Sequence, residues 1–322
     1  MASFDGESIL VTGGTGSLGR RLVQRLTETN ARRIIVYSRD EYKQSEMRGQ
    51  VKDERLRFWL GDVRSLDRLH RAFNGVDRVV HAAALKQVPT LEVNPTEAVA
   101  TNVLGSCNVI EAALDCGVQQ VLGISTDKAV NPINLYGATK LVMEKVLLAA
   151  NDYGGHSTRF SVVRYGNVMG SRGSVIPLFQ KCRERHTGTV PITDPGMTRF
   201  WMTLDQAADL VMLCLERARG GEIFVPRVPS ATIEQLARAV YPDAEMAPIG
   251  VRPGEKLHEI LVGEDREHVL MVDLDDMSRP VQPADRPLLS QENDRWLSLD
   301  SIQSMIASSL GPPTGVPNPT VV

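Results

Sequence analysis

Short apolar runs alternate with amphipathic segments through the first half of the chain. The runs at residues 8–12, 34–38, 57–60, 76–84, 119–126 and 160–168 predict buried β-strands. Between them, apolar residues recur at helical spacing in segments 18–29, 66–73, 102–116 and 136–151. Strands that alternate with helices are typical of βαβ units. We therefore expect an α/β fold, in which a doubly wound parallel sheet is covered by helices on both faces.

A glycine-rich turn follows the first predicted strand. Residues 12–19 read TGGTGSLG, which places Gly13, Gly16 and Gly19 in a G-x-x-G-x-x-G pattern just before a helix. Glycines at such positions allow a tight turn, close approach of the backbone to a pyrophosphate, and contact between helix and strand. Amide groups at the start of the helix then face the anion. The motif in this context predicts a Rossmann dinucleotide-binding domain.

The end of the second predicted strand bears on the choice of cofactor. That strand runs into Ser38, Arg39 and Asp40, with Lys43 beyond. The planar guanidinium of Arg39 suits a ribose 2′-phosphate, which favours NADP. If Arg39 is only a surface charge, Asp40 could instead bind the ribose of NAD. We expect NADP, and we expect Asp62 either at the adenine edge or simply in a turn.

A Y-x-x-x-K motif begins the helix predicted at 136–151. The spacing of Tyr136 and Lys140 places both side chains on one face of that helix. A tyrosine with a pKa of about 10 is a poor base at neutral pH, but a nearby ammonium and an oxidised nicotinamide would stabilise its phenolate. The phenolate could deprotonate a hydroxyl while hydride leaves the same carbon. With Ser125 and Thr126 upstream at a strand end, the motif predicts a dehydrogenase-type site.

Charged residues follow two of the predicted strands. Asp127 and Lys128 come directly after the fifth strand, where an open α/β sheet faces its ligand. They could serve as an acid and a base, or form a solvated ion pair in a loop. Lys86 could hold an anionic ligand or face solvent, and we expect His81 to be structural.

The strand and helix alternation weakens after about residue 168, where Gly, Pro and short elements become frequent. We expect residues 1–168 to form an NADP-binding domain to which later segments return. Residues 169–285 are expected to form mainly a smaller C-terminal substrate-binding lobe, and 286–322 an extension whose Pro- and Gly-rich end is disordered. In the lobe, Arg172, Arg199 and Arg252 could bind phosphate oxygens, or each could be a surface residue.

Composition excludes several classes of partner. The 322 residues include 36 basic and 39 acidic ones, a net charge of −3 without long runs of one sign, so we expect no nucleic-acid surface. The four cysteines form no C-x-x-C pair, which predicts free thiols and no metal site. The start, MASFDGES, lacks a targeting signal, and no apolar run reaches roughly 18 residues. We expect a cytoplasmic protein that does not bind a membrane.

Five long blocks of sequence resemble one enzyme family. The blocks are STDKAVNPINLYGATKL (125–141), VVRYGNVMGSRGSVIP (162–177), MTRFWMTLD (197–205), GGEIFVPRVPS (220–230) and GVRPGEKLHE (250–259). With these blocks in this order, the chain is similar to the inverting UDP-N-acetylglucosamine 4,6-dehydratases of pseudaminic-acid biosynthesis, in the extended short-chain dehydrogenase/reductase superfamily. The resemblance extends to TGGTGSLG, YSRDEYKQSEM (37–47) and HAAALKQVPTLEVNP (81–95), and ends at about residue 262.

The resemblance implies roles for the matching residues. The catalytic residues are implied to be Thr126, Asp127, Lys128, Tyr136 and Lys140, with Lys128 where related retaining dehydratases carry a Glu. The NADP site is implied to include Tyr136, Lys140 and Gly13, Thr15, Gly16, Ser17, Leu18, Gly19, Ser38, Arg39, Asp40, Lys43, Asp62, Val63, Ala82, Ala83, Lys86, Leu104 and Asn167. The sugar nucleotide is implied to contact Lys86, Thr126, Asn167, Arg172, Gly173, Ser174, Val175, Ile176, Thr193, Arg199, Arg252 and Glu255.

The implied reaction converts UDP-N-acetylglucosamine to UDP-2-acetamido-2,6-dideoxy-β-L-arabino-hex-4-ulose. Tyr136 would take the proton of the 4-hydroxyl as C4 is oxidised, and Lys128 would remove the C5 proton. Asp127 would assist loss of the 6-hydroxyl as water; hydride would return to C6, and reprotonation would invert C5. A basic Lys128 must be neutral, and we expect a crowded, cation-rich pocket to lower its pKa.

Three alternatives remain open at this point. A nucleotide-sugar C4 epimerase would share the fold and the Tyr and Lys pair, but would need no elimination pair. A variant dehydratase could give a different outcome at C5 or C6. A non-catalytic NADP-binding sensor is disfavoured because Tyr136 and Lys140 are both present. The resemblance also implies a homo-oligomer, either a dimer or a hexamer.

Overall fold

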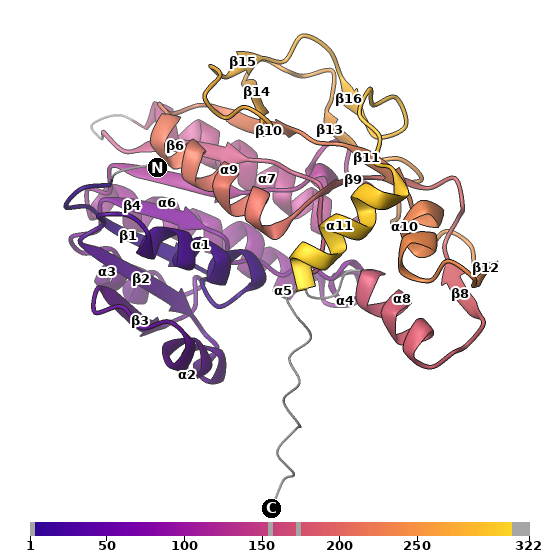
Figure 1. Ribbon diagram of the computed structural model, residues 1–322. Coiled ribbons are helices and arrows are strands. Elements are labelled where there is room, and N and C mark those ends of the chain that lie inside the picture. Colours follow the sequence, from indigo (N-terminus) through magenta and orange to yellow (C-terminus); the bar gives the residue numbers. More distant parts are fainter. Residues whose placement is uncertain (1–3, 154–156, 172–174, 311–322) are drawn as a thin grey trace, which may run out of the picture.

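The computed structural model describes residues 4–153, 157–171 and 175–310 of the chain (Figure 1). Within these ranges, the largest element is a nine-stranded sheet in the order β15-β14-β10-β6-β5-β4-β1-β2-β3. Neighbouring strands are parallel except β14 and β15. The strands are β1 (Ser8–Thr12), β2 (Arg33–Ser38), β3 (Leu56–Leu60), β4 (Arg78–His81), β5 (Gln120–Ile124), β6 (Arg159–Val163), β10 (Ile223–Arg227), β14 (Val269–Asp273) and β15 (Gln282–Pro283). The expected α/β fold with a parallel sheet is confirmed.

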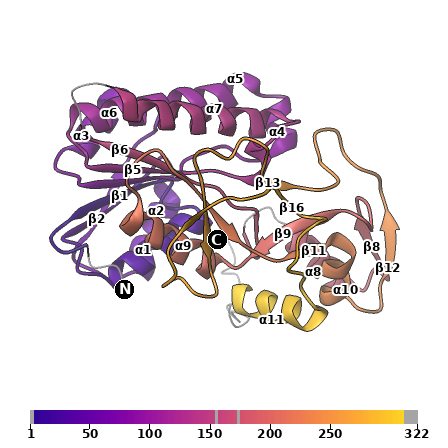
Figure 2. The same ribbon diagram turned by 90° about the horizontal axis from the view of Figure 1, so that it is seen from above.

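Helices bury both faces of this sheet. Every residue of β1 and of β5 is buried, which explains why these strands read as apolar runs and not as an alternating pattern. Helices α1 (Ser17–Thr27) and α9 (Leu204–Arg217) pack together on one face. Helices α3 (Leu66–Phe73), α6 (Gly105–Asp115) and α7 (Leu135–Ala149) cover the other (Figure 2). No helix within the described ranges is both long and apolar enough to cross a lipid bilayer.

A smaller lobe lies beyond the carboxyl ends of the sheet strands (Figures 1 and 2). It contains α8 (Val175–Glu184), α10 (Ile233–Val240) and α11 (Leu299–Leu310). Its short strands form one sheet of β7 (Asn167–Val168), β9 (Thr198–Met202) and β11 (Ser230–Thr232), and another of β8 (Thr189–Ile192) and β12 (Glu245–Pro248). The lobe has its own apolar core, which includes Ile176, Phe179, Trp201, Leu236 and Ile302.

The remaining elements lie along the chain between those already named. They are α2 (Glu41–Gln50), α4 (Val88–Glu92), α5 (Pro95–Ala98), the π-helix η1 (Val99–Leu104), the 3₁₀-helices η2 (Asp127–Ala129) and η3 (Ala150–Asp152), and the paired strands β13 (Ile260–Val262) and β16 (Leu288–Leu289). Strands β10, β14 and β15 follow residue 168 and yet belong to the main sheet. The chain therefore passes between sheet and lobe more than once. The functional assignment of residues 1–168, 169–285 and 286–322 stays a prediction, and the end predicted to be disordered lies outside the described residues.

The strand predicted at 160–168 is divided in the structure. Strand β6 ends at Val163, and Asn167 and Val168 pair instead with β9 of the lobe. Gly166 lies at this crossing, where an added Cβ would approach the Cβ of Phe200 to 2.7 Å. Arg164, Gly166 and Asn167 interrupt the apolar residues at this crossing, and the predicted strand ran through all three of them.

A buried ion pair joins α7 to the sheet. Arg164, directly after β6, donates to both carboxylate oxygens of Glu144 at 3.0 and 2.6 Å. A third hydrogen bond, 3.0 Å long, runs from Arg164 to the carbonyl of Leu261. Arg164 and Glu144 are both buried, so each charge depends on the other for compensation. The pair fixes the helix that carries Tyr136 against the sheet and the β13 segment.

Arg164→Leu should lower the free energy of unfolding by about 3–5 kcal/mol, because it leaves Glu144 buried without its cation. Urea unfolding monitored by circular dichroism measures the change. The matched control is Arg238→Leu, which removes an exposed pair with Glu234 and should cost at most about 1 kcal/mol. The double variant Arg164→Leu/Glu144→Leu should recover much of the loss. Equal unfolding midpoints for the two single variants would contradict the assignment.

Candidate active site

A cavity of about 940 Å³ lies between the carboxyl ends of the sheet strands and the lobe. Turns after β1, β2, β4, β5 and β6 form one side of it, and segments 175–204 and 249–259 form much of the other. This is where open α/β sheets bind their ligands, because the strand order reverses next to β1. Its volume is near the upper end of the range of about 300–1,000 Å³ that is usual for small-molecule and cofactor sites.

This cavity is lined by most of the residues that were predicted for the site. They are Gly13, Thr15, Gly16, Ser17, Leu18, Gly19, Ser38, Arg39, Asp40, Lys43, Asp62, Val63, Ala82, Ala83, Lys86, Thr126, Lys128, Tyr136, Lys140, Asn167, Val175, Thr193, Arg199, Arg252 and Glu255. Three others do not line it: Asp127 and Ile176 are fully buried, and Leu104 is 54% exposed. Arg172, Gly173 and Ser174 lie outside the described residues.

Close packing explains the glycine-rich turn. Gly13 has a φ of 65°, and an added Cβ would meet the backbone of Ala82 at 2.9 Å. At Gly19, an added Cβ would approach the carbonyl oxygen of Gly13 to 2.6 Å. Helix α1 begins after Gly16 and has no side-chain cap in the described structure. Its first amide groups therefore have no side-chain acceptor and point toward the cavity, where an anion can accept hydrogen bonds from them.

The charged residues after β2 are already engaged with one another. Asp40 is the N-cap of α2: its Oδ1 accepts from the Lys43 amide at 2.9 Å, and its Oδ2 accepts from the Lys43 ammonium. The guanidinium of Arg39 lies 3.5 Å from Asp62 and is half exposed at the cavity rim. Asp62 is also held by Arg64 at 2.8 Å. Asp40 is thus committed to a helix cap, whereas Arg39 can turn toward a ligand.

Tyr136 and Lys128 come together because position 137 is a glycine. An added Cβ at Gly137 would lie 2.1 Å from the carbonyl oxygen of Lys128, so α7 can pack against η2 only without a side chain there. Asn134 caps α7 by accepting from the Gly137 amide at 2.8 Å, and its own amide donates to the carbonyl of Gly254 at 2.8 Å. The start of the helix is therefore tied both to η2 and to the lobe.

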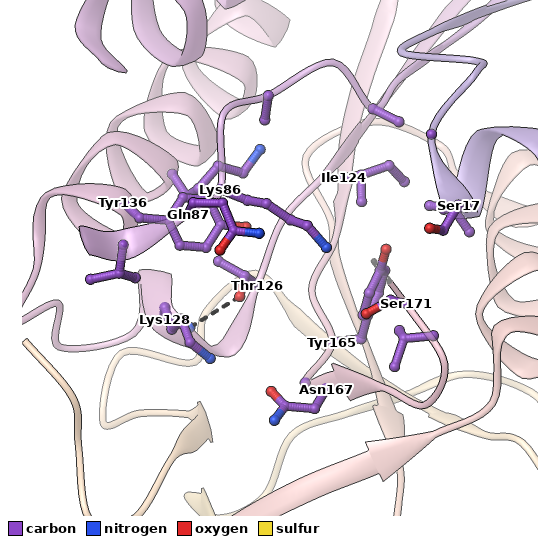
Figure 3. Close-up of a pocket in the computed structure, with 18 of the residues that line it drawn as sticks. Ser17, Lys86, Gln87, Ile124, Thr126, Lys128, Tyr136, Tyr165, Asn167 and Ser171 are labelled. Carbon is purple, nitrogen blue, oxygen red and sulfur yellow. Dashed lines mark hydrogen bonds between the residues drawn. The ribbon is translucent and has the colours of Figure 1, made fainter. Parts of the chain in front are cut away.

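Figure 3 shows the centre of the cavity. Tyr136 from α7, Lys86 and Gln87 from the segment after β4, and Thr126 and Lys128 from the segment after β5 gather around the same space. Burial raises the pKa of Tyr136 to about 12, although the charge of Lys128 and a hydrogen bond with Thr126 oppose the rise. The charge of Lys128 thus acts on this phenol in the structure.

Lys140 is buried with little electrostatic support. Its ammonium lies 2.8 Å from the sulfur of Met143, and Glu144 is one turn further along α7. Burial lowers the pKa of Lys140 to about 8, although Glu144 opposes the shift. Near this Lys, His81 has a pKa lowered by burial to about 3, and it is held between Thr12 and Ser106 at 2.9 and 3.0 Å. The structural role expected for His81 agrees with these contacts.

Lys128 lies between two buried carboxyl groups. Its Nζ is 3.1 Å from Oδ1 of Asp127 and 3.0 Å from Oε1 of Glu259. Burial alone would lower the pKa of Lys128, but the charges of Asp127 and Glu259 raise it above its usual value. The expectation of a lowered pKa was wrong, because it counted the cations of the pocket and missed Glu259. The only sequence signal for Glu259 was its place at the end of the GVRPGEKLHE block.

Of the three lobe arginines predicted to bind phosphate, Arg199 and Arg252 lie within the described residues, and their surroundings differ. Arg199 is buried, and its guanidinium donates to the carbonyls of Thr198, Lys256 and Leu257 at 2.7–3.1 Å. It therefore braces the 256–259 segment and is not a surface residue. Arg252 is more than half exposed at the cavity rim and forms an ion pair with Glu255. Of the two, Arg252 is the one with a guanidinium that a ligand can reach directly.

Comparison with known proteins places this fold and cavity in a family. Residues 9–279 match a family model described as polysaccharide biosynthesis protein. The chain belongs to this family. It is 49% identical over 268 residues to the UDP-N-acetylglucosamine 4,6-dehydratase (inverting) of Campylobacter jejuni, covering 83% of this chain and 80% of that protein. This confirms the family resemblance found in the sequence.

Two other relatives widen the comparison. A protein of Rickettsia felis named UDP-glucose 4-epimerase is 45% identical over 271 residues, covering 81% of this chain and 79% of that protein. The X-ray structure of Pen from Bacillus thuringiensis aligns with a TM-score of 0.86 at 33% identity, covering 94% of this chain and 97% of that one. The polysaccharide biosynthesis family thus includes close relatives named for two different reactions on nucleotide sugars, so the chemistry must be argued from the site.

Lys140→Met should raise the free energy of unfolding at pH 7 by about 3 kcal/mol, because a buried ammonium with a pKa near 8 is costly to keep charged. The unfolded chain binds this proton more tightly, so the wild-type protein gains stability as the pH rises from about 8 to 10.5. The advantage of the variant should therefore shrink across that window. Urea unfolding at pH 7 and pH 10 measures both effects.

Lys145→Met is the matched control, since Lys145 is an exposed lysine on the same helix. It should change stability by less than about 0.5 kcal/mol at either pH. A Lys140→Met protein that is less stable than the wild type at pH 7, or an advantage that does not fall with pH, would show that Lys140 is not a strained cation.

Proposed function

We propose that this chain is an NADP-dependent, inverting UDP-N-acetylglucosamine 4,6-dehydratase. The observation that carries the proposal is Lys128, which lines the cavity beside Tyr136 and is held by two buried carboxyl groups. Tyr136 and a nicotinamide would suffice for an epimerase, which only moves hydride at C4. A lysine and an acid next to the same space add what elimination requires, a base for the C5 proton and a donor for the leaving hydroxyl.

The residues of the first half fit a dinucleotide. The turn at 13–19 leaves no room for a Cβ at Gly13 or Gly19, and α1 directs amide groups toward the cavity end. When bound, the nicotinamide would accept hydride from C4 of the sugar and return it to C6. Arg39 and Lys43 line the cavity after β2 and could pair with a ribose 2′-phosphate, and Asp40 is occupied as a helix cap. These contacts favour NADP over NAD.

The lobe side of the cavity would hold the sugar nucleotide. Asn167, Thr193 and Arg252 line it, Lys86 lines the sheet side, and together they offer donors for phosphate and sugar oxygens. Glu255 pairs with Arg252 at the rim and would orient it. One side of the site comes from the lobe and the other from the sheet strands. Substrate binding therefore requires the lobe to be packed against the sheet.

In the proposed mechanism, Tyr136 takes the proton of the 4-hydroxyl, and the C4 ketone then acidifies the C5 proton. Lys128 removes that proton as a neutral amine, after its ammonium has released one proton to solvent in the cavity. Asp127 supplies a proton to the departing 6-hydroxyl. Because Asp127 does not line the cavity, its proton would travel through Thr126, 2.9 Å away, or through Lys128, 3.1 Å away. Reprotonation of C5 on the opposite face completes the inversion.

A nucleotide-sugar C4 epimerase stays the second candidate, since the Rickettsia felis relative carries that name. A dehydratase with a different outcome at C5 or C6 is the third. We also propose that the protein is a homo-oligomer, a dimer or a hexamer, because Val99, Leu104 and Val142 expose apolar surface on adjoining helices. Both proposed ligands are metabolites of the cytoplasm, which is the proposed location.

Incubation of the protein with UDP-N-acetylglucosamine in deuterated water should give a product lighter by one water, with a new C6 methyl group and deuterium at C5. Proton NMR and mass spectrometry follow the reaction, and ring couplings report inversion at C5. The Lys128→Ala variant should oxidise C4 but form product at least about 100-fold more slowly. Conversion to the galacto isomer at unchanged mass would establish the epimerase instead.

Arg39→Ala should weaken NADP binding roughly 10- to 100-fold while changing NAD binding little, because only NADP places a phosphate against the guanidinium. Isothermal titration with each dinucleotide measures the two affinities. Arg57→Ala is the control, since Arg57 donates to backbone carbonyls at Glu54 and Leu56 and does not line the cavity. An equal loss for NAD and NADP would remove Arg39 from phosphate recognition.

A further inference from the structure

Glu259 is the second buried carboxyl group beside Lys128. It lies just before β13, is 2% exposed, and lines the cavity, whereas Asp127 is 0% exposed and does not. Its Oε1 is 3.0 Å from the Lys128 ammonium and 3.7 Å from Nε of Arg199. None of the roles predicted from the sequence falls on Glu259.

Two carboxyl groups that share one cation in a buried space do not both keep a full negative charge, because their repulsion is poorly screened there. Within the described residues, Glu259 pairs with two cations, Lys128 and Arg199, whereas Asp127 pairs with Lys128 alone. A negative charge is therefore less costly on Glu259 than on Asp127, and the proton is expected on Asp127. In agreement, burial and the charge of Glu259 raise the pKa of Asp127, while Lys128 and Arg199 outweigh burial and lower the pKa of Glu259.

Two unpaired carboxyl oxygens support this assignment of the charge to Glu259 and of the proton to Asp127. Oδ2 of Asp127 and Oε2 of Glu259 are both buried and have no hydrogen-bond partner in the described structure. A buried carboxylate oxygen without a donor is costly while it carries charge, and protonation removes that cost. For Glu259 the nearby guanidinium of Arg199 offsets the cost, but among the described residues Asp127 has no second cation in direct contact. A proton on Asp127 is the less costly solution.

The position of Glu259 is fixed from several sides. Its amide donates to Ser290 at 2.8 Å, and Arg199 holds the backbone of the two residues at 256 and 257. The charged groups that face the Asp127 and Lys128 pair are Glu259, Arg199 from β9 and Lys256, which donates to the carbonyl of Val130. Tyr136 from α7 completes the set. Glu259 is the one acid among these neighbours.

We propose that Glu259 is a positioning residue for the elimination step: its carboxylate holds the Lys128 ammonium at the cavity and, by its charge, keeps on Asp127 the proton that the departing hydroxyl needs. This inference rests on the proposed dehydratase function for its chemical meaning. It assigns to the lobe, which contributes Glu259 and Arg199, control over the protonation of a pair that belongs to the sheet side of the site.

Infrared difference spectroscopy tests the protonation directly, with protein alone at neutral pH. The wild-type protein should show the carbonyl stretch of a buried carboxylic acid, and Asp127→Asn should lose that band. Glu259→Gln should lose it too, because Asp127 then becomes the sole counter-ion of Lys128 and ionises. Glu234→Gln, which removes an exposed acid from α10, should keep the band. A band that survives in Glu259→Gln, or no Asp127 band in the wild type, overturns the proposal.

Single-turnover kinetics with UDP-N-acetylglucosamine test the consequence. Glu259→Gln should form reduced nicotinamide within about threefold of the wild-type rate but lose water at least about tenfold more slowly. The alkaline limb of its pH profile for water loss should move to lower pH, since Asp127 ionises more easily. Glu259→Asp, which keeps the charge, should restore part of the rate. Equal slowing of both steps, or no slowing, would refute the positioning role.

The two tests separate this inference from the proposed function. If the wild-type protein does not dehydrate UDP-N-acetylglucosamine, the proposed function fails, and the infrared comparison still decides whether the charge of Glu259 keeps Asp127 protonated. If Glu259→Gln does not fold, as judged by circular dichroism, two other results test the inference. These are the behaviour of Glu259→Asp and the loss of the wild-type infrared band in Asp127→Asn. Absence of that wild-type band overturns the inference even when dehydration is observed.

Discussion

Helix α7 can lie against η2 only because residue 137 has no side chain. An added Cβ there would lie 2.1 Å from the carbonyl oxygen of Lys128, which is well inside contact distance. This approach places Tyr136 next to Lys128 and lets each act on the other's charge. The Asn134 cap and the buried Arg164 and Glu144 pair then hold the helix at this distance. The proposed oxidation and elimination chemistry both depend on this one contact between backbones.

Around that contact, the two parts of the fold contribute opposite halves of one charge cluster. The sheet side supplies Asp127 and Lys128 on η2, and the lobe supplies Glu259 and Arg199. Because a proton is proposed on Asp127, Lys128 takes its counter-charge from Glu259, and separating the two halves would leave a buried cation without compensation. The cluster therefore couples the packing of the lobe against the sheet to the protonation of the residues proposed to eliminate water. It also explains why Lys128 is charged in a pocket that contains several other cations.

The family includes relatives named for dehydration and for epimerisation, and both reactions begin with oxidation at C4. The glycine-rich turn and the Tyr136 and Lys140 pair are compatible with either one. What distinguishes this site is the set of groups behind Tyr136: a lysine at the cavity surface and two acids, one of which lines the cavity and one of which does not. Small changes in these groups, on an unchanged scaffold, would be enough to redirect the ketone intermediate.

The sequence by itself determined the sheet, the helices with strong apolar periodicity and the glycine-rich turn, because these follow from local pattern and local backbone requirements. It also placed Tyr136 and Lys140 on one helix face. It missed α2, where only Gln44 and Met47 are buried, and it ran a strand through Gly166, where the chain changes sheets. Tertiary structure alone brought Glu259 to Lys128 and thereby reversed the expected direction of its pKa shift. Charge interactions of this kind depend on distance and burial, which residues far apart in the chain acquire only on folding.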